Sequence, residues 1–479
     1  MDLKGKKVLV VGIARSGIAV ARLLASRGAM VIGNDIKPAS ELREAADELR
    51  KLGVTLSLGS HPESLFVNAD LIVLSPGVPA DLEPLESARR AGIQIISEPE
   101  LAGRFLRGRM IGVTGSNGKT TVTTLIGELM RAAGADVIVG GNIGTPLTSL
   151  IEKSTDVSWT VAELSSFQLE TIDSLRVNVA VVTNITPDHL DRHGSLENYV
   201  SAKHRIFLNQ TEDDRAVLNG QDQGVADMVA KLGVPSKKVY FSSRGPETLT
   251  GAAAGVYYRA GRVCTTLLTD RQGEVDVIGL DEISVPGMHN VENVMTALGA
   301  TFCAIEMGGT AAGDLPALRD AIRRFKGVEH RIEYVAEIDG IKFYNDSKAT
   351  NVDSTIKSLA AFERNIIVIL GGKDKGSDYT VLAPLVRDRV KQIILIGAAS
   401  DKIAGQLEGT RPIARARSMQ DAVLSAVQVA AAGDIVLLAP ACASFDMFDS
   451  YEHRGRVFKE AVYKLASRAH SGWTGRLTT

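Results

Sequence analysis

A glycine-rich turn in the first third of the chain has residue types that suit phosphate binding. The stretch GVTGSNGKTT, residues 112–121, ends a short apolar run and precedes a helical pattern. Glycines let backbone N–H groups point at phosphate oxygens, and the following helix N-terminus adds a favourable dipole. In such a loop Lys119 reaches the outer phosphates and the Thr120 hydroxyl holds Mg²⁺. A strict P-loop has glycine where Val113 stands, so an ordinary strand–turn–helix corner is the alternative interpretation.

Polar residues downstream of this loop follow apolar runs that indicate buried strands. Glu163 follows WTVA, Asp188 and His189 come after VNVAVV, and Lys203 lies in a helical pattern. Open α/β sheets bind ligands at the carboxyl ends of their strands, and carboxylates are Mg²⁺ ligands. Singly, His189 and Lys203 are interpreted as a loop histidine and a solvated lysine. Beside a phosphate loop, the set predicts a shared metal site.

Three polar loops follow apolar runs in the last third of the chain. In NDSKATN, residues 345–351, Asp346 is placed to hold a ribose. The candidates for binding an anion in these loops are Lys348, Thr350, Lys373, Lys375 and Ser444. If the three runs are neighbouring parallel strands, the loops share one sheet edge and converge on a small anionic substrate. Separate solvated loops are the alternative.

The N-terminal stretch VLVVGIARSGIAVARLL is similar to a dinucleotide-binding fingerprint. Gly12 and Gly17 stand at the expected positions, Ala14 replaces the middle glycine, and Asp35 follows the next apolar run at a place suited to ribose or base contact. The pattern supports a nucleotide diphosphate site without identifying NAD. A purely structural turn is the alternative.

Apolar runs and amphipathic segments alternate along the whole chain, which predicts an α/β protein with parallel sheets. We expect three domains. Residues 1–98 form a Rossmann-like domain, residues 99–327 a P-loop domain with a small antiparallel appendage near 236–285, and residues 328–479 a second Rossmann-like α/β domain.

Composition excludes several classes of protein. A net charge of −2 over 479 residues gives no basic surface for nucleic acid. Three widely spaced cysteines argue against a disulfide framework or a zinc knuckle and fit a reducing cytosol. The N-terminal apolar run is interpreted as a buried strand rather than a signal peptide, and we see no stretch of about 18 apolar residues that would span a membrane.

Taken together, these motifs resemble those of the Mur ligase family. In chain order they are TGSNGKTT, TNITPDHLDRHGS, SAKHRIF, MHNVENVMTA, HRIE and NDSKATN. GIARSG, GGNIG, ELSSFQLE and APACASFDMFDSYEHRG are similar to members that add D-glutamate to UDP-N-acetylmuramoyl-L-alanine. The resemblance implies an ATP-dependent ligase that works through an acyl phosphate and releases ADP.

The resemblance also implies residue roles. Those implied in catalysis are Lys119, Asp188, His189 and Lys203. Those implied for ATP are Gly115, Ser116, Asn117, Gly118, Lys119, Thr120, Thr121, Asn293, Arg331 and Asp346. Those implied for the UDP-sugar substrate are Ser16, Asp35, Ser75 and Asn142. Those implied for D-glutamate are Lys348, Thr350, Lys375, Ser444 and Tyr451. Relatives often have Phe at position 451 and Gly at position 14; neither departure removes a charged contact.

Two Mg²⁺ sites are implied, one at Thr120 and Glu163 and a second at His189 and Lys203. In the family the matching lysine carries a carbamate formed with CO₂. This turns a cation into an anionic oxygen ligand and accounts for a lysine among metal ligands, since an ammonium would repel Mg²⁺.

Three other functions stay open at this stage. A sister ligase of the same fold would add another amino acid or extend folate, although a UDP-type glycine loop argues against folate. An NAD-dependent oxidoreductase would leave residues 112–121 unexplained, and a transport or mechanical ATPase would hydrolyse ATP without an amino acid. We expect a cytoplasmic monomer with small-molecule substrates and no nucleic-acid or membrane partner.

Overall fold

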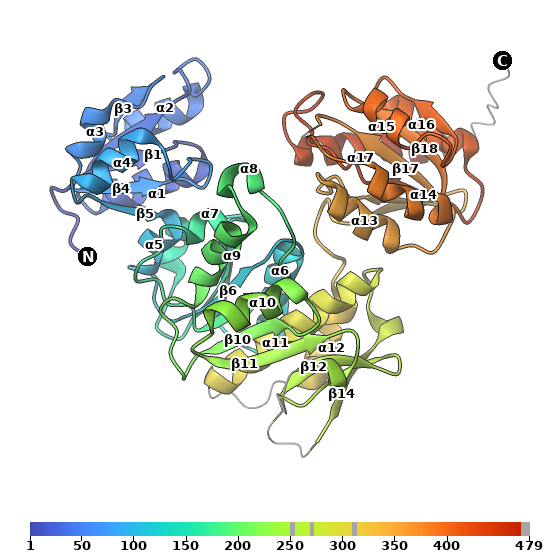
Figure 1. The fold of residues 1–479 in the computed structure, drawn as a ribbon, viewed down its shortest axis with the longest axis horizontal. Coiled ribbons are helices and arrows are strands. Elements are labelled where there is room, and N and C mark those ends of the chain that lie inside the picture. The colour runs from blue at the N-terminus through green and yellow to red at the C-terminus, as the bar shows by residue number, and fades with distance from the viewer. Residues whose placement is uncertain (250–253, 269–272, 309–313, 375, 471–479) are drawn as a thin grey trace. The chain divides into compact units, whose positions relative to one another are not determined.

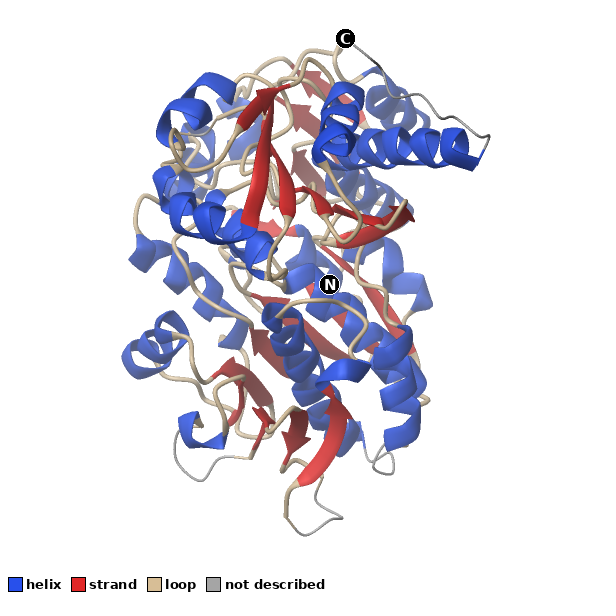
Figure 2. Cartoon of the chain, turned by 90° about the vertical axis from the view of Figure 1, so that its right-hand side faces the viewer, coloured by secondary structure: helices blue, strands red, loops and turns tan. Residues whose placement is uncertain are grey.

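Strands and flanking helices alternate along the chain in the computed structural model, which describes residues 1–249, 254–268, 273–308, 314–374 and 376–470 (Figures 1 and 2). The strands form three separate sheets within these ranges. The predicted three-domain α/β class is confirmed. No helix in the described part of the chain is both long enough and apolar enough to cross a membrane.

The N-terminal sheet is parallel throughout, with strand order β3-β2-β1-β4-β5. Its strands are β1 (Lys7–Val11), β2 (Met30–Asp35), β3 (Thr55–Leu58), β4 (Leu71–Leu74) and β5 (Gln94–Ser97). Its helices are α1 (Arg15–Ser26), α2 (Arg43–Lys51), α3 (Glu63–Val67), α4 (Glu83–Arg90) and α5 (Glu98–Gly103). The order reverses between β1 and β4, so the turn after β1 opens at a topological switch point.

Successive apolar side chains of β1 belong alternately to two hydrophobic clusters, one on each face of the sheet. Val8 and Val10 belong to one buried cluster, whereas Leu9 and Val11 belong to another. Successive side chains of a strand point to opposite faces, so a sheet covered by helices on both faces needs a continuous apolar run. This is why KVLVV contains no polar residue after Lys7.

The central sheet has strand order β14-β13-β12-β11-β10-β9-β6-β8-β7 among the described residues. Its strands are β6 (Arg109–Thr114), β7 (Val137–Gly141), β8 (Trp159–Glu163), β9 (Val179–Val182), β10 (Arg215–Asn219), β11 (Lys237–Ser242), β12 (Gly255–Arg259), β13 (Arg262–Thr265) and β14 (Val275–Gly279). Its α-helices are α6 (Lys119–Ala132), α7 (Ser166–Leu169), α8 (Leu190–His193), α9 (Leu196–His204), α10 (Gln223–Leu232), α11 (Met288–Gly308) and α12 (Leu315–Arg324). The 3₁₀ segments η1 (Leu147–Lys153), η2 (Arg205–Phe207), η3 (Pro246–Thr248) and η4 (Leu280–Glu282) connect them.

The expected antiparallel appendage is smaller than residues 236–285 and continues the same sheet. β11 pairs in parallel with β10, and β12 pairs in parallel with β11. Antiparallel pairing begins only between β12 and β13 and continues to β14. The run KVYFSS therefore belongs to the parallel part, because its alternating apolar residues do not distinguish a half-covered parallel strand from an antiparallel one.

The C-terminal sheet has strand order β15-β16-β20-β17-β18-β19. Its strands are β15 (Glu333–Ile338), β16 (Ile341–Asn345), β17 (Ile366–Gly371), β18 (Val390–Ile396), β19 (Ile413–Arg415) and β20 (Ile435–Leu438). Its helices are α13 (Val352–Ala360), η5 (Thr380–Leu382), α14 (Ala383–Arg389), α15 (Ser400–Gln406), α16 (Met419–Val429) and α17 (Tyr451–His470). β16, β20 and β17 are parallel neighbours, so the three polar loops after them do share one edge, as the sequence predicts.

Two compact units emerge from the packing of the chain. One comprises residues 1–282 and 292–323, and the other comprises residues 283–291 and 324–479. The first two predicted domains therefore pack together as one unit. The predicted boundary at residue 98 falls between β5 and α5, within that unit.

Two buried carboxyl groups of α5 join the N-terminal and central sheets within the first unit. Glu100 accepts hydrogen bonds from the backbone N–H groups of Asp173, Ser174 and Leu175 and from Arg104 Nε at 2.9 Å. Burial alone would raise the pKa of Glu100, but these bonds outweigh it and lower the pKa below its usual value. The carboxylate is therefore held ionised at the joint.

The pKa of Glu98, two residues earlier, shifts in the opposite direction, because burial favours the neutral, protonated carboxyl group. Its Oε1 accepts the backbone N–H of Thr148 at 2.6 Å and the Thr148 hydroxyl at 2.8 Å, while its Oε2 has no hydrogen-bond partner among the described residues. Burial raises the pKa of Glu98 to about 7, although the bonds from Thr148 oppose this rise. The carboxyl group therefore takes up a proton on folding when the pH lies between 4.5 and about 7.

Replacing Glu98 with glutamine should make the stability of the first unit less dependent on pH. Because the folded state binds the extra proton, the contribution of Glu98 to stability is fully present below pH 4.5 and is lost as the pH rises to about 7. The full effect is on the order of 3 kcal/mol. We expect the thermal midpoint of the wild type to fall relative to that of Glu98→Gln between pH 4.5 and about pH 7.

Glu100→Gln is the matched control for this experiment. It removes an ionised group with good donors, so it should lower the midpoint over the same pH range instead of flattening its pH dependence. Parallel pH profiles for the wild type and Glu98→Gln would show that the Glu98 carboxyl is not protonated on folding.

Candidate active site

The predicted phosphate loop lies between β6 and α6, and two of its glycines have backbone angles that suit glycine alone. Gly115 has φ +142° and Gly118 has φ +83°. A Cβ on Gly115 would lie 2.0 Å from Thr183 Oγ1, and one on Gly118 would lie 2.6 Å from Asn293 Oδ1. Neighbouring side chains therefore pack closely against the loop, and α6 begins at Lys119.

Residues after β9 hold this loop in place. Ser116 N–H donates to Asn184 O and Asn117 N–H donates to Asn184 Oδ1, both at 2.9 Å. The Thr183 hydroxyl donates to Asn117 O at 2.6 Å, and the Ser116 hydroxyl lies 3.0 Å from Tyr199 OH. Sequence reasoning did not single out Thr183, Asn184 or Tyr199. The adjacency of β6 and β9, which brings them to the loop, is a property of the sheet order.

Two lysine ammonium groups donate to the same backbone oxygen. Lys119 Nζ donates to Gly115 O at 2.9 Å and to Ser116 O at 2.8 Å, and Lys203 Nζ donates to Gly115 O at 2.8 Å. Lys203 is 1% exposed and its Nζ lies 4.4 Å from the ring centroid of Tyr199. Burial first, and Lys119 second, lower the pKa of Lys203 well below its usual value, against the opposing effects of Asp188 and Glu163.

The carboxylate predicted to bind metal is buried beside the loop. Glu163, the last residue of β8, is 2% exposed. Its Oε2 accepts the Thr120 hydroxyl at 2.8 Å, and its Oε1 accepts Asn142 Nδ2 at 2.9 Å. The structure thus brings together Thr120 and Glu163, which sequence reasoning paired, and adds Asn142, which it assigned to the sugar-nucleotide substrate. An oxygen donor pair of this kind suits Mg²⁺.

His189 lies at the rim of this region rather than inside it. It has φ 53°, its side chain is 49% exposed, and its Nε2 is 3.6 Å from Asp188 Oδ2. Its ring packs edge-on against Phe167 with centroids 5.0 Å apart. A left-handed backbone conformation in a residue other than glycine is strained, and such strain occurs often at functional sites.

A cavity of about 430 Å³ lies beside α7, α8 and α9, and a second cavity of about 350 Å³ lies at the turn after β1. The second is lined by all three residues predicted for the UDP end, which are Ser16, Asp35 and Ser75. Asp35 Oδ2 accepts Ile13 N–H at 3.0 Å, and the Ser75 hydroxyl donates to Gly12 O at 2.6 Å. These bonds fix the glycine turn at the switch point of the sheet. His61 also lines this cavity and was not predicted.

The loops after β16 and β20 are connected by one fully buried guanidinium. Arg454 donates to Ser347 O at 2.7 Å, Ser347 Oγ at 2.9 Å, Cys442 O at 3.1 Å and Ala443 O at 3.3 Å. The loop after β17 joins them, because Lys373 N–H donates to Ala443 O at 2.9 Å. The structure therefore brings the three predicted loops together.

Within these loops, Lys348 and Tyr451 are in direct contact. Lys348 Nζ lies 3.8 Å from the centroid of the Tyr451 ring, which is a cation–π geometry. Thr350 N–H donates to Lys348 O at 2.7 Å, and Ser444 is buried at the start of the next loop. Lys375, the fifth residue predicted for the amino acid, lies outside the described residues.

The residues predicted for the adenosine part of ATP belong to both units. Asn293 lies beside Gly118 in the first unit, whereas Arg331 and Asp346 are in the second. Burial raises the pKa of Asp346 to about 6, opposed by a hydrogen bond from the Ser358 hydroxyl and by Arg331.

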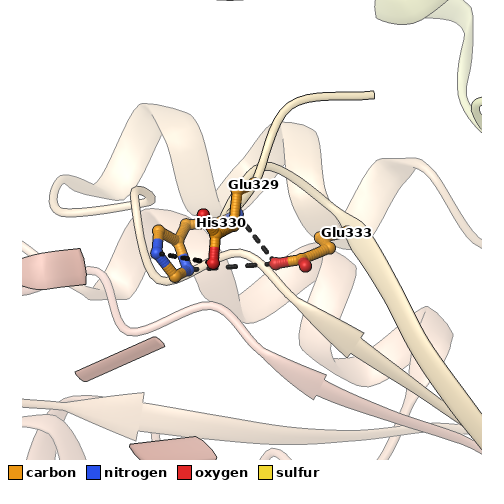
Figure 3. Close-up of side chains that lie close together, drawn as sticks. All are labelled: Glu329, His330 and Glu333. Atoms are coloured by element: carbon orange, nitrogen blue, oxygen red, sulfur yellow. Dashed lines mark hydrogen bonds and ion pairs between the residues drawn. The ribbon is translucent and has the colours of Figure 1, made fainter. Parts of the chain in front are cut away.

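A separate cluster near Arg331 contains the types of side chain that bind metal ions, but a lysine already balances its carboxylates. Glu329, His330 and Glu333 lie together at the start of β15 (Figure 3). Lys459 Nζ donates to Glu329 Oε1 at 2.6 Å and to Glu333 Oε1 at 2.8 Å, so an ammonium already balances both carboxylates. We interpret the cluster as an ion-pair network that supports the neighbouring Arg331.

Three family models match the chain in order. The Mur ligase MurD-like N-terminal domain matches residues 6–97, the Mur ligase middle domain matches residues 113–301, and the Mur ligase glutamate ligase domain matches residues 330–442. Together they cover all three sheets. The match to the middle domain includes the phosphate loop, Glu163 and Lys203.

Curated relatives match over almost their full length. The chain is 48% identical to UDP-N-acetylmuramoylalanine–D-glutamate ligase of Acidobacterium capsulatum, covering 99% of each chain. It is 46% identical to the protein of the same name from Koribacter versatilis, covering 98% of this chain and 99% of that one. A solved pseudomurein peptide ligase type C from Methanothermus fervidus shares the fold, with a TM-score of 0.57 at 19% identity over 96% of this chain and all of the other.

Gly115→Ala should lower the affinity for ATP by about tenfold or more, because the added Cβ has no room against Thr183 and the backbone would be strained by about 1–3 kcal/mol. Calorimetric titration with a non-hydrolysable ATP analogue measures this. Gly405→Ala is the control, since a Cβ there meets no atom within 4 Å and the residue lies inside α15. Wild-type affinity in Gly115→Ala would show that the loop does not bind phosphate.

Proposed function

The chain belongs to the Mur ligase family, and from this premise we infer that it joins D-glutamate to UDP-N-acetylmuramoyl-L-alanine with conversion of ATP to ADP and phosphate. The observation that carries this inference is identity of 46–48% to ligases of that name over 98–99% of the chain. The product is a precursor of peptidoglycan, so the proposed place of action is the cytoplasm, with cell-wall synthesis and cell division as the processes served.

The chemistry explains why a phosphate loop is needed. A carboxylate resists attack by an amine, because its negative charge repels the nucleophile. Transfer of the γ-phosphoryl group of ATP to the L-alanine carboxylate gives an acyl phosphate with a good leaving group. The amine of D-glutamate then attacks the acyl carbon, the tetrahedral intermediate expels phosphate, and an amide bond results. Positioning and charge stabilisation are what the protein supplies.

The phosphate loop supplies part of that stabilisation. Its backbone N–H groups and the α6 N-terminus favour the phosphates of ATP, and the Lys119 ammonium, folded over the loop, neutralises charge on the transferred group. Gly115, Ser116, Asn117, Gly118, Thr120 and Thr121 form the rest of the proposed phosphate site. Asn293, Arg331 and Asp346 would hold the nucleoside. Asn293 belongs to the first unit, and Arg331 and Asp346 belong to the second.

The donor atoms at the loop fit a first Mg²⁺. Thr120 and Glu163 offer a hydroxyl and a buried carboxylate whose oxygens are already 2.8 Å apart. When bound, Mg²⁺ neutralises phosphate charge and orients the oxygens. His189 and Lys203 are proposed to hold a second ion, and Asp188, next to His189, to orient groups at this site. An unmodified Lys203 does not fit a cation site.

A carbamate on Lys203 would remove that conflict. The ammonium first loses a proton to give the neutral amine. Addition of CO₂ to the amine then forms an N–C bond and releases a second proton, so the side chain ends as an anion with two oxygens. Burial and the neighbouring Lys119 favour the neutral amine, which is the form that reacts. The new anion would also attract the Lys119 ammonium, which shares Gly115 O with Lys203.

The remaining proposed contacts bind the two other substrates. Ser16, Asp35 and Ser75 would hold the UDP end in the cavity after β1, and Asn142 the sugar side. Lys348 would pair with a carboxylate of D-glutamate, with Thr350, Ser444, Tyr451 and the undescribed Lys375 completing the site. Fixing both carboxylates of the amino acid places its amine near the acyl carbon. We propose that the enzyme acts as a monomer.

ADP release should require UDP-N-acetylmuramoyl-L-alanine and should increase strongly when D-glutamate is added. A coupled assay with a panel of amino acids measures this, because a sister ligase would prefer L-alanine or meso-diaminopimelate instead. Equal ATP turnover without either substrate would favour a transport or mechanical ATPase. Tight binding of a nicotinamide cofactor, measured by fluorescence, would favour an oxidoreductase.

Lys203→Ala should nearly abolish ligase activity, and short carboxylates such as acetate should partly restore it by supplying the missing oxygen ligand. Lys231→Ala, which changes an exposed lysine of α10, is the control and should keep normal turnover. Normal turnover by Lys203→Ala would exclude the carbamate. Loss of activity without any rescue at high carboxylate concentration would leave Lys203 acting as an amine.

A further inference from the structure

An arginine three residues after His189, the proposed metal ligand, contacts the wall of the cavity at the turn after β1. This is the cavity proposed to bind the UDP end of the sugar nucleotide. Arg192, in α8, donates through Nη1 to Pro76 O at 2.8 Å and through Nη2 to Val78 O at 2.6 Å. Both acceptors belong to the loop after β4, which lines the cavity that also contains Ser16. A guanidinium that binds two carbonyls two residues apart fixes both the position and the orientation of that loop.

The other face of Arg192 rests on an aromatic ring that also contacts His189. Arg192 Cζ lies 3.8 Å from the centroid of Phe167, and the same ring packs edge-on against His189 at 5.0 Å. Phe167 comes from α7, whereas Arg192 and His189 flank the start of α8 (Figure 1). A displacement of the cavity wall would therefore move Arg192 and, through it, the Phe167 ring. The ring in turn contacts His189, the proposed metal ligand.

A hydrogen-bonded histidine keeps this ring in place. His193 stacks on Phe167 with centroids 5.1 Å apart and an interplanar angle of 13°. Its Nε2 is 2.9 Å from Ser166 Oγ and its Nδ1 is 3.2 Å from Glu170 Oε1. Both imidazole nitrogens thus have polar partners in the α7 region, and the Phe167 ring contacts both His193 and Arg192 of α8.

We propose that Arg192 is a positioning residue that couples occupancy of the sugar-nucleotide cavity to the conformation of residues 186–195, and thereby to the orientation of His189. The inference rests on the proposed function in that the cavity is taken to bind the UDP end of the substrate. Filling the cavity fixes the Pro76 and Val78 carbonyls, and Arg192 transmits that order through Phe167. The metal site is then organised only when the substrate to be phosphorylated is present.

UDP alone is the probe, because it fills the cavity and has no alanine carboxylate that would reach the metal directly. In wild-type protein with a chelator present, UDP should slow amide hydrogen exchange in peptides that cover residues 186–195. Arg192→Met keeps the length of the side chain and its contact with Phe167 but loses both donors. It should bind UDP within about threefold of wild type but lose the UDP-dependent slowing. Arg192→Lys should retain only part of it.

Arg27→Met is the matched control. Arg27 also connects the N-terminal and central parts of the first unit, through an ion pair of 3.3 Å with Glu152 and a position 5.0 Å over Phe105, but it touches neither site. It should keep the full UDP-dependent slowing. Thermal midpoints of all variants separate loss of coupling from loss of folding, since a purely structural role would change exchange with and without UDP equally.

The outcomes separate this proposal from the proposed function. If UDP binds the wild type but leaves exchange in residues 186–195 unchanged, or if Arg192→Met keeps the slowing, the coupling role is wrong and the ligase assignment stands. If calorimetry shows that UDP does not bind the wild type, both the coupling role and the assignment of this cavity to the UDP end are wrong, whereas the ligase reaction itself is decided by the ADP-release assay. With coupling confirmed, Arg192→Met should also raise the Mg²⁺ concentration needed for half-maximal ADP release by about tenfold, which matches a coupling of moderate size.

Discussion

The carbonyl oxygen of Gly115 accepts hydrogen bonds from two lysines that lie 84 residues apart in the chain, Lys119 and Lys203. Two basic side chains share one partial negative charge in a site where Lys203 is almost fully buried, so burial and Lys119 together disfavour a positive charge on Lys203. Such an arrangement is costly unless an anion joins it, and the loop is built for anions. The Glu163 carboxylate opposes this excess of positive charge, and the proposed phosphate and carbamate would oppose it further. The neighbouring structure follows from it: Thr183 and Asn184 fix the loop, and Glu163 is held between Thr120 and Asn142.

Parallel sheets bring this chemistry together in all three parts of the chain. In the first sheet the glycine turn after β1 opens beside β4, in the second the loops after β6, β8 and β9 meet, and in the third the loops after β16, β20 and β17 meet. Every one of these places is the carboxyl end of neighbouring parallel strands. The substrates of a ligase differ in size and charge, and each of the three sheets provides a separate edge at which a substrate can bind. Buried carboxyl groups of α5 fasten the first two sheets to each other.

Much of this could be predicted from the sequence, because continuous apolar runs such as KVLVV and IIVILG identify buried parallel strands and the polar residues after them identify sheet edges. The short strands β3 and β5 cannot be identified in this way, since their partly exposed residues lack such a run. The antiparallel appendage begins later in the chain than predicted, because the alternating apolar residues of KVYFSS do not show whether that strand is parallel or antiparallel. At the site, Lys119, Thr120 and Glu163 were found from motif and position. Tyr199, Phe167 and Arg192 were not, because their contacts cross between elements whose adjacency depends on sheet order.

Arg454 gives the C-terminal unit a property that concerns its evolution. Three of its four hydrogen bonds end on main-chain oxygens, at Ser347, Cys442 and Ala443. Main-chain oxygens are present whatever side chains the loops carry. Exchanges at the exposed ends of those loops can therefore change the side chains of the proposed amino-acid site while the scaffold keeps its shape. A lineage could diversify its cell-wall peptide in small steps, without first having to reinvent the frame.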